Sequence, residues 1–255
     1  MIFSQCKNTL EHLTDYIDSD PENVVKEVER TSSAAQNESI NSPQVKVEEL
    51  EREPNTLGMI GMYVGRFDNN MINITIESVE DGRVYGRSIC AGNDRPLSGT
   101  YIYEGGNKFY LDLQEPGDDK YDGVFRAVVD LSISSMSGTW SPYNPSAASS
   151  KTFDIPKRTY RYDPNVGIWP ETSRRELMYD ELWEYTEEEL NLMRNEIFAR
   201  HGHSFKNIDL RRHFESQPWY IPIDDEVSDR LSRIERENVR FIKEAEDSYD
   251  EFFGR

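Results

Sequence analysis

The amino-acid sequence predicts an α+β protein of two domains, in which an antiparallel up-and-down β-barrel of about eight strands precedes a small all-α helical module. Three observations carry this prediction. Apolar residues recur at every second position through the middle of the chain, and turn residues separate these segments at nearly regular spacing. In the last third, the spacing of apolar residues changes to that of helices. We place the barrel in residues 56–165, the helical module in residues 166–255, and a disordered acidic tether in residues 1–55.

The tether is rich in Ser, Asn and Glu, and it offers too little apolar surface to offset the chain entropy that folding would cost. Near its start, Phe3-Ser4-Gln5 precedes Cys6 and a long polar tract follows. This order resembles the junction of a bacterial lipoprotein whose signal peptide is missing, although Gln5 stands where a small residue is usual. Lipidation of Cys6 would supply a single lipid anchor. The alternative is a free cysteine in a flexible tail.

The barrel prediction rests on alternating strands. In Met71–Glu77 the three isoleucines share one face and the polar residues share the other, and segments 109–114 and 124–131 alternate in the same way. Turn residues separate the strands at 81–82, 92–94, 105–107 and 116–118. The residues expected to point inward are Ile72, Ile74, Ile76, Phe109, Leu111, Leu113, Phe125, Val129 and Trp140. A meander of this size closes into a barrel to remove its edges.

A glycine precedes an aromatic residue by two positions in three strands, at Gly61-Met62-Tyr63, Gly99-Thr100-Tyr101 and Gly138-Thr139-Trp140. Glycine inside a strand is typical of tight bends. The pattern resembles the small up-and-down barrels of the lipocalin and avidin type. Barrels of eight strands are either filled by side chains or hold one small ligand. The bulky inward residues favour a filled interior, so carriage of a small apolar ligand is the alternative function.

A hinge at 164–170 precedes the helical module. The first predicted helix begins at the capping box Thr186–Glu189 and ends at Gly202. A second short helix follows at 207–214, and a third begins at Ser228. Three short helices around a few aromatic residues make a small all-α module.

The run Arg194-Asn195-Glu196-Ile197-Phe198-Ala199-Arg200-His201-Gly202 resembles the signature of the YARHG domain. The other motif residues follow in the family's order: Phe205, Leu210, Phe214, Pro218-Trp219-Tyr220 and Pro222. The resemblance covers roughly residues 173–244. Phe198 stands where the family usually has tyrosine, and His213 stands where a second aromatic residue is common.

The resemblance implies an exported or envelope-associated bacterial protein. Segments 90–96 and 115–123 are similar to motifs of lipoproteins that carry such a barrel before a YARHG domain. The implied location is therefore the bacterial cell envelope, either periplasmic or at the surface with a lipid anchor at Cys6. A cytoplasmic location is the alternative if the chain start is genuine.

Charge and composition exclude several classes of function. The 255 residues include 48 acidic and 29 basic side chains, a formal net charge of -19. This excess repels a phosphate backbone, and no basic stripe with interleaved aromatic residues is present, so nucleic acid is not an expected partner. No run approaches the roughly 20 apolar residues of a membrane span. The two cysteines have no metal-ligand spacing, and we expect no cofactor.

Arg200, His201 and Gly202 are the first candidate site. Basic residues in a last helical turn complement the helix dipole and glycine supplies the left-handed cap, so a structural role accounts for all three. The functional alternative is contact with an anionic group of a ligand or partner. His203 and His213 lie nearby in the sequence, but no cysteine or HExxH pattern joins them, so the sequence predicts no metal site.

Asp118, Asp119 and Asp122 crowd one predicted loop, where oxygen ligands could hold a cation such as calcium. Their spacing is not that of an EF-hand, and a solvated turn is the alternative. Asp94 and Arg95 are expected to form an ion pair in another loop.

These observations predict a non-catalytic interaction protein that binds a protein or a cell-wall component in the envelope, with Trp219 and Tyr220 as further candidate contacts. No Gly-x-Ser-x-Gly elbow is present, and Cys90 has no histidine in the predicted barrel. A role in cell-wall or peptide hydrolysis is therefore only a remote alternative.

Overall fold

The computed structural model describes residues 55–253, which lie in one compact unit. Nearly all of the predicted tether, with Cys6, lies outside the described residues. The strands are β1 (Gly61–Phe67), β2 (Asn70–Glu80), β3 (Arg83–Cys90), β4 (Asn93–Gly105), β5 (Lys108–Gln114), β6 (Gly123–Asp130), β7 (Ser135–Pro142) and β8 (Lys151–Arg158).

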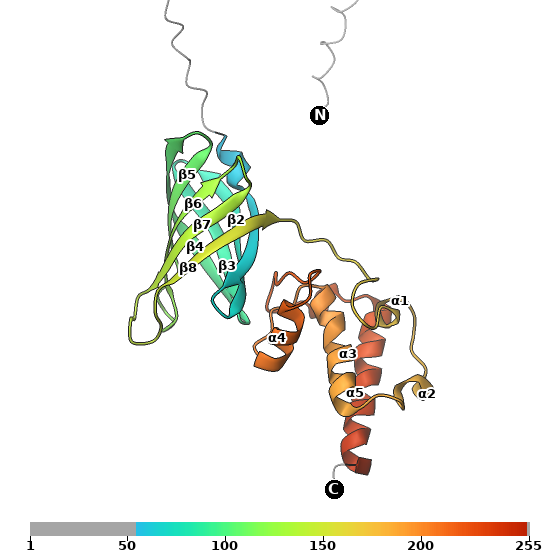
Figure 1. The fold of residues 1–255 in the computed structure, drawn as a ribbon. Helices are drawn as coiled ribbons and strands as arrows, with labels where there is room; N and C mark the ends of the chain where they lie inside the picture. The colour runs from blue at the N-terminus through green and yellow to red at the C-terminus, as the bar shows by residue number, and fades with distance from the viewer. Residues whose placement is uncertain (1–54, 254–255) are drawn as a thin grey trace, which may run out of the picture. The chain divides into compact units, whose positions relative to one another are not determined.

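These eight strands form a closed antiparallel barrel in sequence order (Figure 1). Each strand pairs with the next, and β1 closes the barrel by pairing with β8 at Met62 and Tyr63. A short 3-10 helix, η2 (Thr56–Met59), precedes β1. The predicted eight-stranded meander is therefore confirmed.

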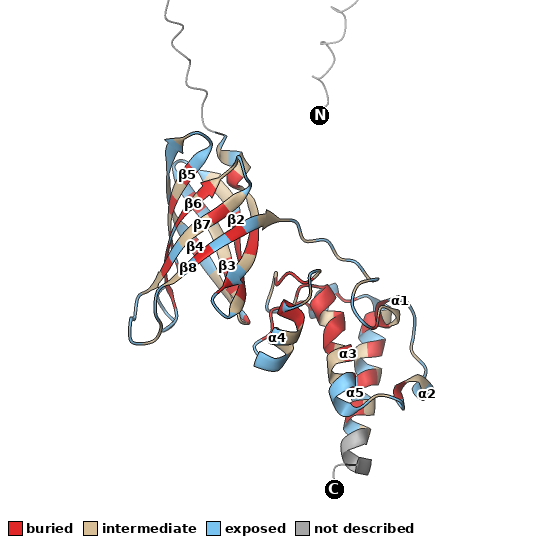
Figure 2. Ribbon diagram, in the orientation of Figure 1, coloured by how far each residue is buried: buried red, intermediate tan, exposed pale blue. Residues whose placement is uncertain are grey.

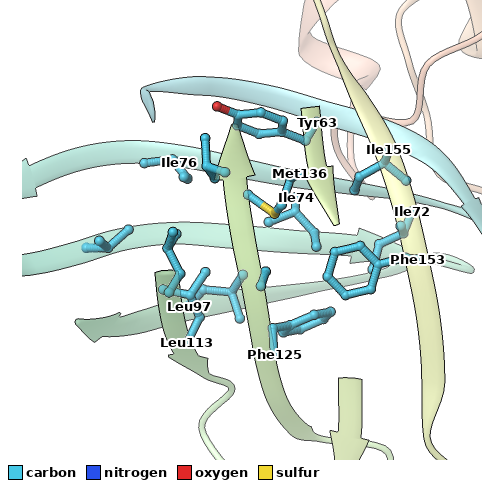
Figure 3. Packing of buried hydrophobic residues seen from close by; sticks show 14 of the residues in the cluster. Tyr63, Ile72, Ile74, Ile76, Leu97, Leu113, Phe125, Met136, Phe153 and Ile155 are labelled. Carbon is cyan, nitrogen blue, oxygen red and sulfur yellow. The ribbon is translucent and has the colours of Figure 1, made fainter. Parts of the chain in front are cut away.

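Side chains from all eight strands fill the barrel interior. Every residue of the predicted inward set is at most 5% exposed. Figure 3 shows Tyr63, Ile74, Met136 and Ile155 among the side chains that converge there from different strands. Since large aliphatic and aromatic groups occupy this space together, the interior is the hydrophobic core of the barrel.

Two of the three strand glycines lie where neighbouring backbones come close. A Cβ at Gly99 would overlap the carbonyl oxygen of Asp112, and a Cβ at Gly138 would overlap that of Arg126. The third, Gly61, has a φ of +137°, a conformation that side chains with a Cβ rarely adopt. The Gly-aromatic pattern thus marks positions where only glycine fits.

The helices follow the barrel in the chain. They are α1 (Glu171–Arg174), α2 (Tyr179–Leu182), α3 (Glu187–Arg200), α4 (Ile208–Glu215) and α5 (Arg233–Phe253), with a 3-10 helix η3 (Ser228–Arg230) before α5. Helices α3 and α5 lie side by side, and buried residues run along both (Figures 1 and 2). None of the helices in the described part of the chain has the length and apolarity that a membrane span requires.

Most predicted helix boundaries are confirmed. Thr186 and Glu189 form the capping box of α3, and Gly202 follows the helix at a φ of +78°. Helix α4 begins after Asn207, whose side chain accepts the N–H groups of two residues of its first turn. The third predicted helix was placed too early, because Ser228–Arg230 forms a separate 3-10 turn and α5 begins at Arg233.

Outward-facing residues of β1 and β2 are covered by the chain after α3. Val64 and Met71 are in one buried cluster with Phe205, Phe214 and three other residues between 199 and 221. Asn73, expected on a polar outer face, is 0% exposed, and its Nδ2 donates to the carbonyl of Pro222 at 2.8 Å. The expected exposure is wrong here because a distant segment packs on this side of the barrel.

Candidate functional site

Arg200 is the centre of a buried polar network. Its side chain is 0% exposed. The guanidinium donates to the carbonyls of Val166 and Trp169, to the hydroxyls of Thr172 and Ser173, and to the carboxylate of Glu196. Burial lowers the pKa of Arg200, while the charge of Glu196 raises it. Because its donors are engaged inside the protein, Arg200 acts as a structural group and not as a contact for an outside anion.

Glu196 fixes the segment that enters the helical module. It accepts the N–H groups of Ile168 at 2.8 Å and Trp169 at 2.9 Å. Gly167, with a φ of +96°, lets the backbone pass so close that a Cβ would overlap this carboxylate. The C-terminal half of the segment predicted as a hinge is therefore bound to α3.

His201 pairs with a second buried acid. Its Nε2 lies 3.0 Å from Oε2 of Glu235, and the ring of Tyr162 stacks on it at 4.5 Å. Glu235 also accepts bonds from Ser173, from Tyr162 and from the N–H of Ser232. Burial alone would raise the pKa of Glu235, but the bonds from His201, Ser232 and Ser173 outweigh it and hold the pKa at about 2.

Trp219 and Tyr220 differ in accessibility. Tyr220 is 1% exposed and its hydroxyl donates to the carbonyl of His203 at 2.6 Å, so it is a core residue. Trp219 is half-buried beside it and lines a cavity of about 550 Å³ with residues 160–166.

A different group of aromatic side chains is exposed. Met178, Tyr179 and Trp183 are 60%, 50% and 64% exposed at helix α2. The rings of Tyr179 and Trp183 meet edge to face at 5.1 Å, and Tyr179 also lies 5.9 Å from the ring of Phe241 in α5. Large apolar side chains grouped on a surface are typical of contact sites. The sequence analysis missed this surface because it predicted no helix at 179–182, where α2 lies.

The same segment is strongly acidic. Residues 176–190 contain seven Asp and Glu residues and no Lys or Arg. Arg175 pairs with Glu181, and Arg233 pairs with Glu176. The other five, at positions 180, 184 and 187–189, are exposed and have no ion-pair partner among the described residues. We call Met178, Tyr179 and Trp183, with the acids at 180 and 184, the aromatic–acidic surface.

A comparison with protein-family models decides the identity of this region. Residues 166–247 match the YARHG domain. No curated protein and no solved structure matches the chain. The match starts at Val166, earlier than the sequence resemblance suggested, and the carbonyl of Val166 accepts a bond from Arg200. Within the motif, Arg200 thus joins the first residues of the YARHG domain to α3, and His201 joins the end of α3 to Glu235 of α5.

The aromatic–acidic surface lies within the YARHG domain, whereas the predicted cation site lies in the barrel. There Asp122 accepts two bonds from Arg95, at 3.0 and 2.6 Å, and the N–H of Gly117 at 2.9 Å. Burial raises the pKa of Asp122, but the Arg95 bonds outweigh this effect and lower it. Asp118 also pairs with Arg95, while Asp119 accepts the N–H of Tyr121. Two of the three predicted ligands, Asp118 and Asp122, are thus occupied by the guanidinium of Arg95.

The predicted pair of Asp94 with Arg95 is wrong. Both residues lie in β4, where neighbours point to opposite faces of the sheet. Asp94 pairs with Arg87 of β3 and lies close to Asp224 and Asp225 of the YARHG domain. Arg87 and Arg230 already compensate this acidic group.

One buried carboxylate of the barrel was not predicted as a site. Glu115 follows β5 and is 8% exposed. It accepts bonds from the hydroxyl of Ser88 at 2.8 Å, the N–H of Gly123 at 2.7 Å and the indole of Trp140 at 3.1 Å. Burial raises the pKa of Glu115 more than these bonds lower it.

Replacing Glu115 by Gln is expected to remove a pH-dependent loss of stability. The folded protein holds the Glu115 proton more tightly than the unfolded chain, so the wild-type stability falls as pH rises from about 4.5, the unfolded-state pKa. The amide cannot ionise, so the difference in free energy of unfolding should grow in favour of Glu115→Gln as the pH rises above about 4.5, and it should level off above the folded-state pKa. Urea unfolding over this pH range measures it, with Glu77→Gln on the barrel exterior as the control. A constant difference would contradict the prediction.

Proposed function

We propose that this protein is a non-catalytic, envelope-associated interaction protein whose YARHG domain binds a basic segment of a partner protein at the aromatic–acidic surface. The observation that carries this proposal is the exposure of Trp183, 64%, in a segment with seven acids and no basic residue. A soluble protein gains nothing in its own core from such a side chain.

The chemistry of the surface favours a cationic occupant. Trp and Tyr are the residue types that most often dominate protein interfaces, because they bury a large area with few rotatable bonds. Their ring faces also attract Lys and Arg, and this attraction adds to that of nearby carboxylates. Asp180 and Glu184, on either side of Trp183 in the sequence, would steer and orient such a segment.

The envelope location is part of the proposal. It is supported by the YARHG match and by the resemblance of the Cys6 region to a lipoprotein junction. A lipid anchor at Cys6 followed by a polar tether would hold the YARHG domain near the membrane within reach of partners. Mass spectrometry of the protein from its native host tests this point separately, by the presence or absence of a lipid mass on Cys6.

Replacing Trp183 by Ala is expected to weaken the binding of a short peptide that alternates Arg with Leu by about 30-fold, the effect of losing one interface anchor. Fluorescence anisotropy of the labelled peptide with the full chain measures the Kd. Ile208→Ala is the matched control, since Ile208 is also an exposed apolar residue, 47%, on another helix of the YARHG domain. Its Kd should stay near the wild-type value.

A pair of charge variants separates local recognition from overall acidity. The first double variant, Asp180→Asn with Glu184→Gln, removes two charges from the aromatic–acidic surface. The second, Glu80→Gln with Glu104→Gln, removes the same charge from the barrel. Only the first pair should weaken binding, and high salt should weaken it as well. Equal losses from both pairs, or a wild-type Kd for Trp183→Ala, would contradict the proposed function.

A further inference from the structure

A cavity of about 550 Å³ lies at one end of the barrel. Its lining comes from the β1–β2, β3–β4, β5–β6 and β7–β8 connections, which meet at the same end of an up-and-down barrel. Arg211 of α4 contributes to it from the YARHG domain. The volume is in the range of small-molecule sites, roughly 300–1,000 Å³.

The inner side of this cavity is aromatic. Phe67, Phe125 and Trp140 line it, and their ring centroids lie 5.9 to 6.5 Å apart. Phe67 and Trp140 are each 5% exposed, so only part of each ring reaches the cavity. These rings offer an apolar contact to a bound molecule.

Two cations of the cavity have weak partners. Lys151 Nζ lies 4.7 Å from the centroid of Phe67, and its paired carboxylate, Asp68, is 3.9 Å away and 56% exposed. Arg211 donates to the carbonyls of Phe205 and Lys206, at 3.5 and 3.2 Å, and has no carboxylate partner among the described residues. A carboxylate between them would gain charge-assisted hydrogen bonds.

The acids of the cavity are largely engaged. Glu115 accepts three hydrogen bonds, and Asp122 is neutralised by Arg95. Asp119 accepts the N–H of Tyr121. Among the cations that line the cavity, Lys151 and Arg211 are therefore the two without a strong carboxylate partner in the described part of the chain.

We propose that this cavity binds a small molecule with a carboxylate on a short apolar chain. The carboxylate binds Lys151 and Arg211, and the apolar chain contacts Phe67, Phe125 and Trp140. Because Arg211 belongs to the YARHG domain and the other residues to the barrel, the ligand would contact both. This site is independent of the aromatic–acidic surface.

Titration of the full chain with octanoate, octylamine and acetate tests the proposal. Octanoate should bind and shift the indole N–H signal of Trp140, which the Glu115 bond makes a local reporter. Octylamine has a similar chain with the opposite charge, and acetate has the carboxylate without the chain. Both should bind at least about tenfold more weakly, the loss expected for one charge-assisted bond or a few buried methylenes. Equal binding of either probe, or no shift of Trp140, would overturn the proposal.

Adjacent arginines of α4 give a matched pair of variants. Arg211→Gln and Arg212→Gln change the same charge, but only Arg211 lines the cavity. Arg211→Gln should weaken octanoate binding about tenfold or more, and Arg212→Gln should change it by less than about twofold. Lys151→Met and Lys108→Met form a second pair, with loss of binding expected for the first. Equal effects within both pairs would overturn the proposed carboxylate position.

Discussion

Replacing Arg200 by Met is expected to lower the free energy of unfolding by about 3–5 kcal/mol, the cost of removing one partner from a buried ion pair. Methionine keeps much of the side-chain length but donates no hydrogen bond. The carboxylate of Glu196 would then stay buried without its countercharge, and the carbonyls of Val166 and Trp169 would lose a donor. Urea unfolding followed by tryptophan fluorescence and circular dichroism measures the change.

Arg194→Met is the control for this experiment. Arg194 lies in the same helix and also pairs with an acid, Glu246, but its side chain is 21% exposed. Water can replace part of that pairing, so we expect Arg194→Met to lower the free energy of unfolding by about 1 kcal/mol. A loss at Arg200 no larger than the loss at Arg194 would show that the buried network does not stabilise the YARHG domain.

Replacing Gly99 by Ala is expected to destabilise the barrel by about 3 kcal/mol or more, at the upper end of overpacking costs. The added Cβ would overlap the carbonyl oxygen of Asp112 and lie 2.8 Å from its carbon. Both atoms are backbone of the paired strand, so no side-chain rotation relieves the contact. The two strands would have to separate, and the Gly99–Leu113 pairing of β4 with β5 would be disturbed. The midpoint of thermal or urea unfolding measures the loss.

Gly105→Ala isolates the other cost of replacing a glycine. Gly105 has a φ of +87°, but a Cβ there would meet no atom within 4 Å. The substitution should therefore cost only the conformational penalty, about 1–2 kcal/mol. If both variants lose the same amount, steric overlap is not the reason for glycine at position 99.

The barrel was predictable because its signals are local. Alternation along each strand and turn residues between strands depend on neighbours in the chain, and the inward residues followed from them. Asn73 was assigned to the wrong environment because Pro222, which buries it, is far away in the sequence. Helix α2 is a single turn, too short for a helical period to be visible.

The residues of the candidate site were predictable only where their role depends on one helix end. Gly202 follows from its place after α3, but the partners of Arg200 come from residues 166–173 and no local pattern connects them. Sequence reasoning therefore assigned Arg200 to the helix dipole. Likewise, the pairing of Arg95 with Asp122 depends on strand order, while adjacency in the sequence suggested Asp94 instead.

The packing of the YARHG domain on β1 and β2 determines which variants can be used to study its role in the cell. A recombinant fragment limited to the YARHG match would leave the apolar partners of Val64 and Met71, among them Phe205 and Phe214, open to self-association. A strain that lacks the YARHG domain would in turn produce a barrel with Val64 and Met71 uncovered. Its phenotype would combine loss of the proposed interaction with a damaged barrel, so single substitutions on the exposed face of α2 report more cleanly than deletions.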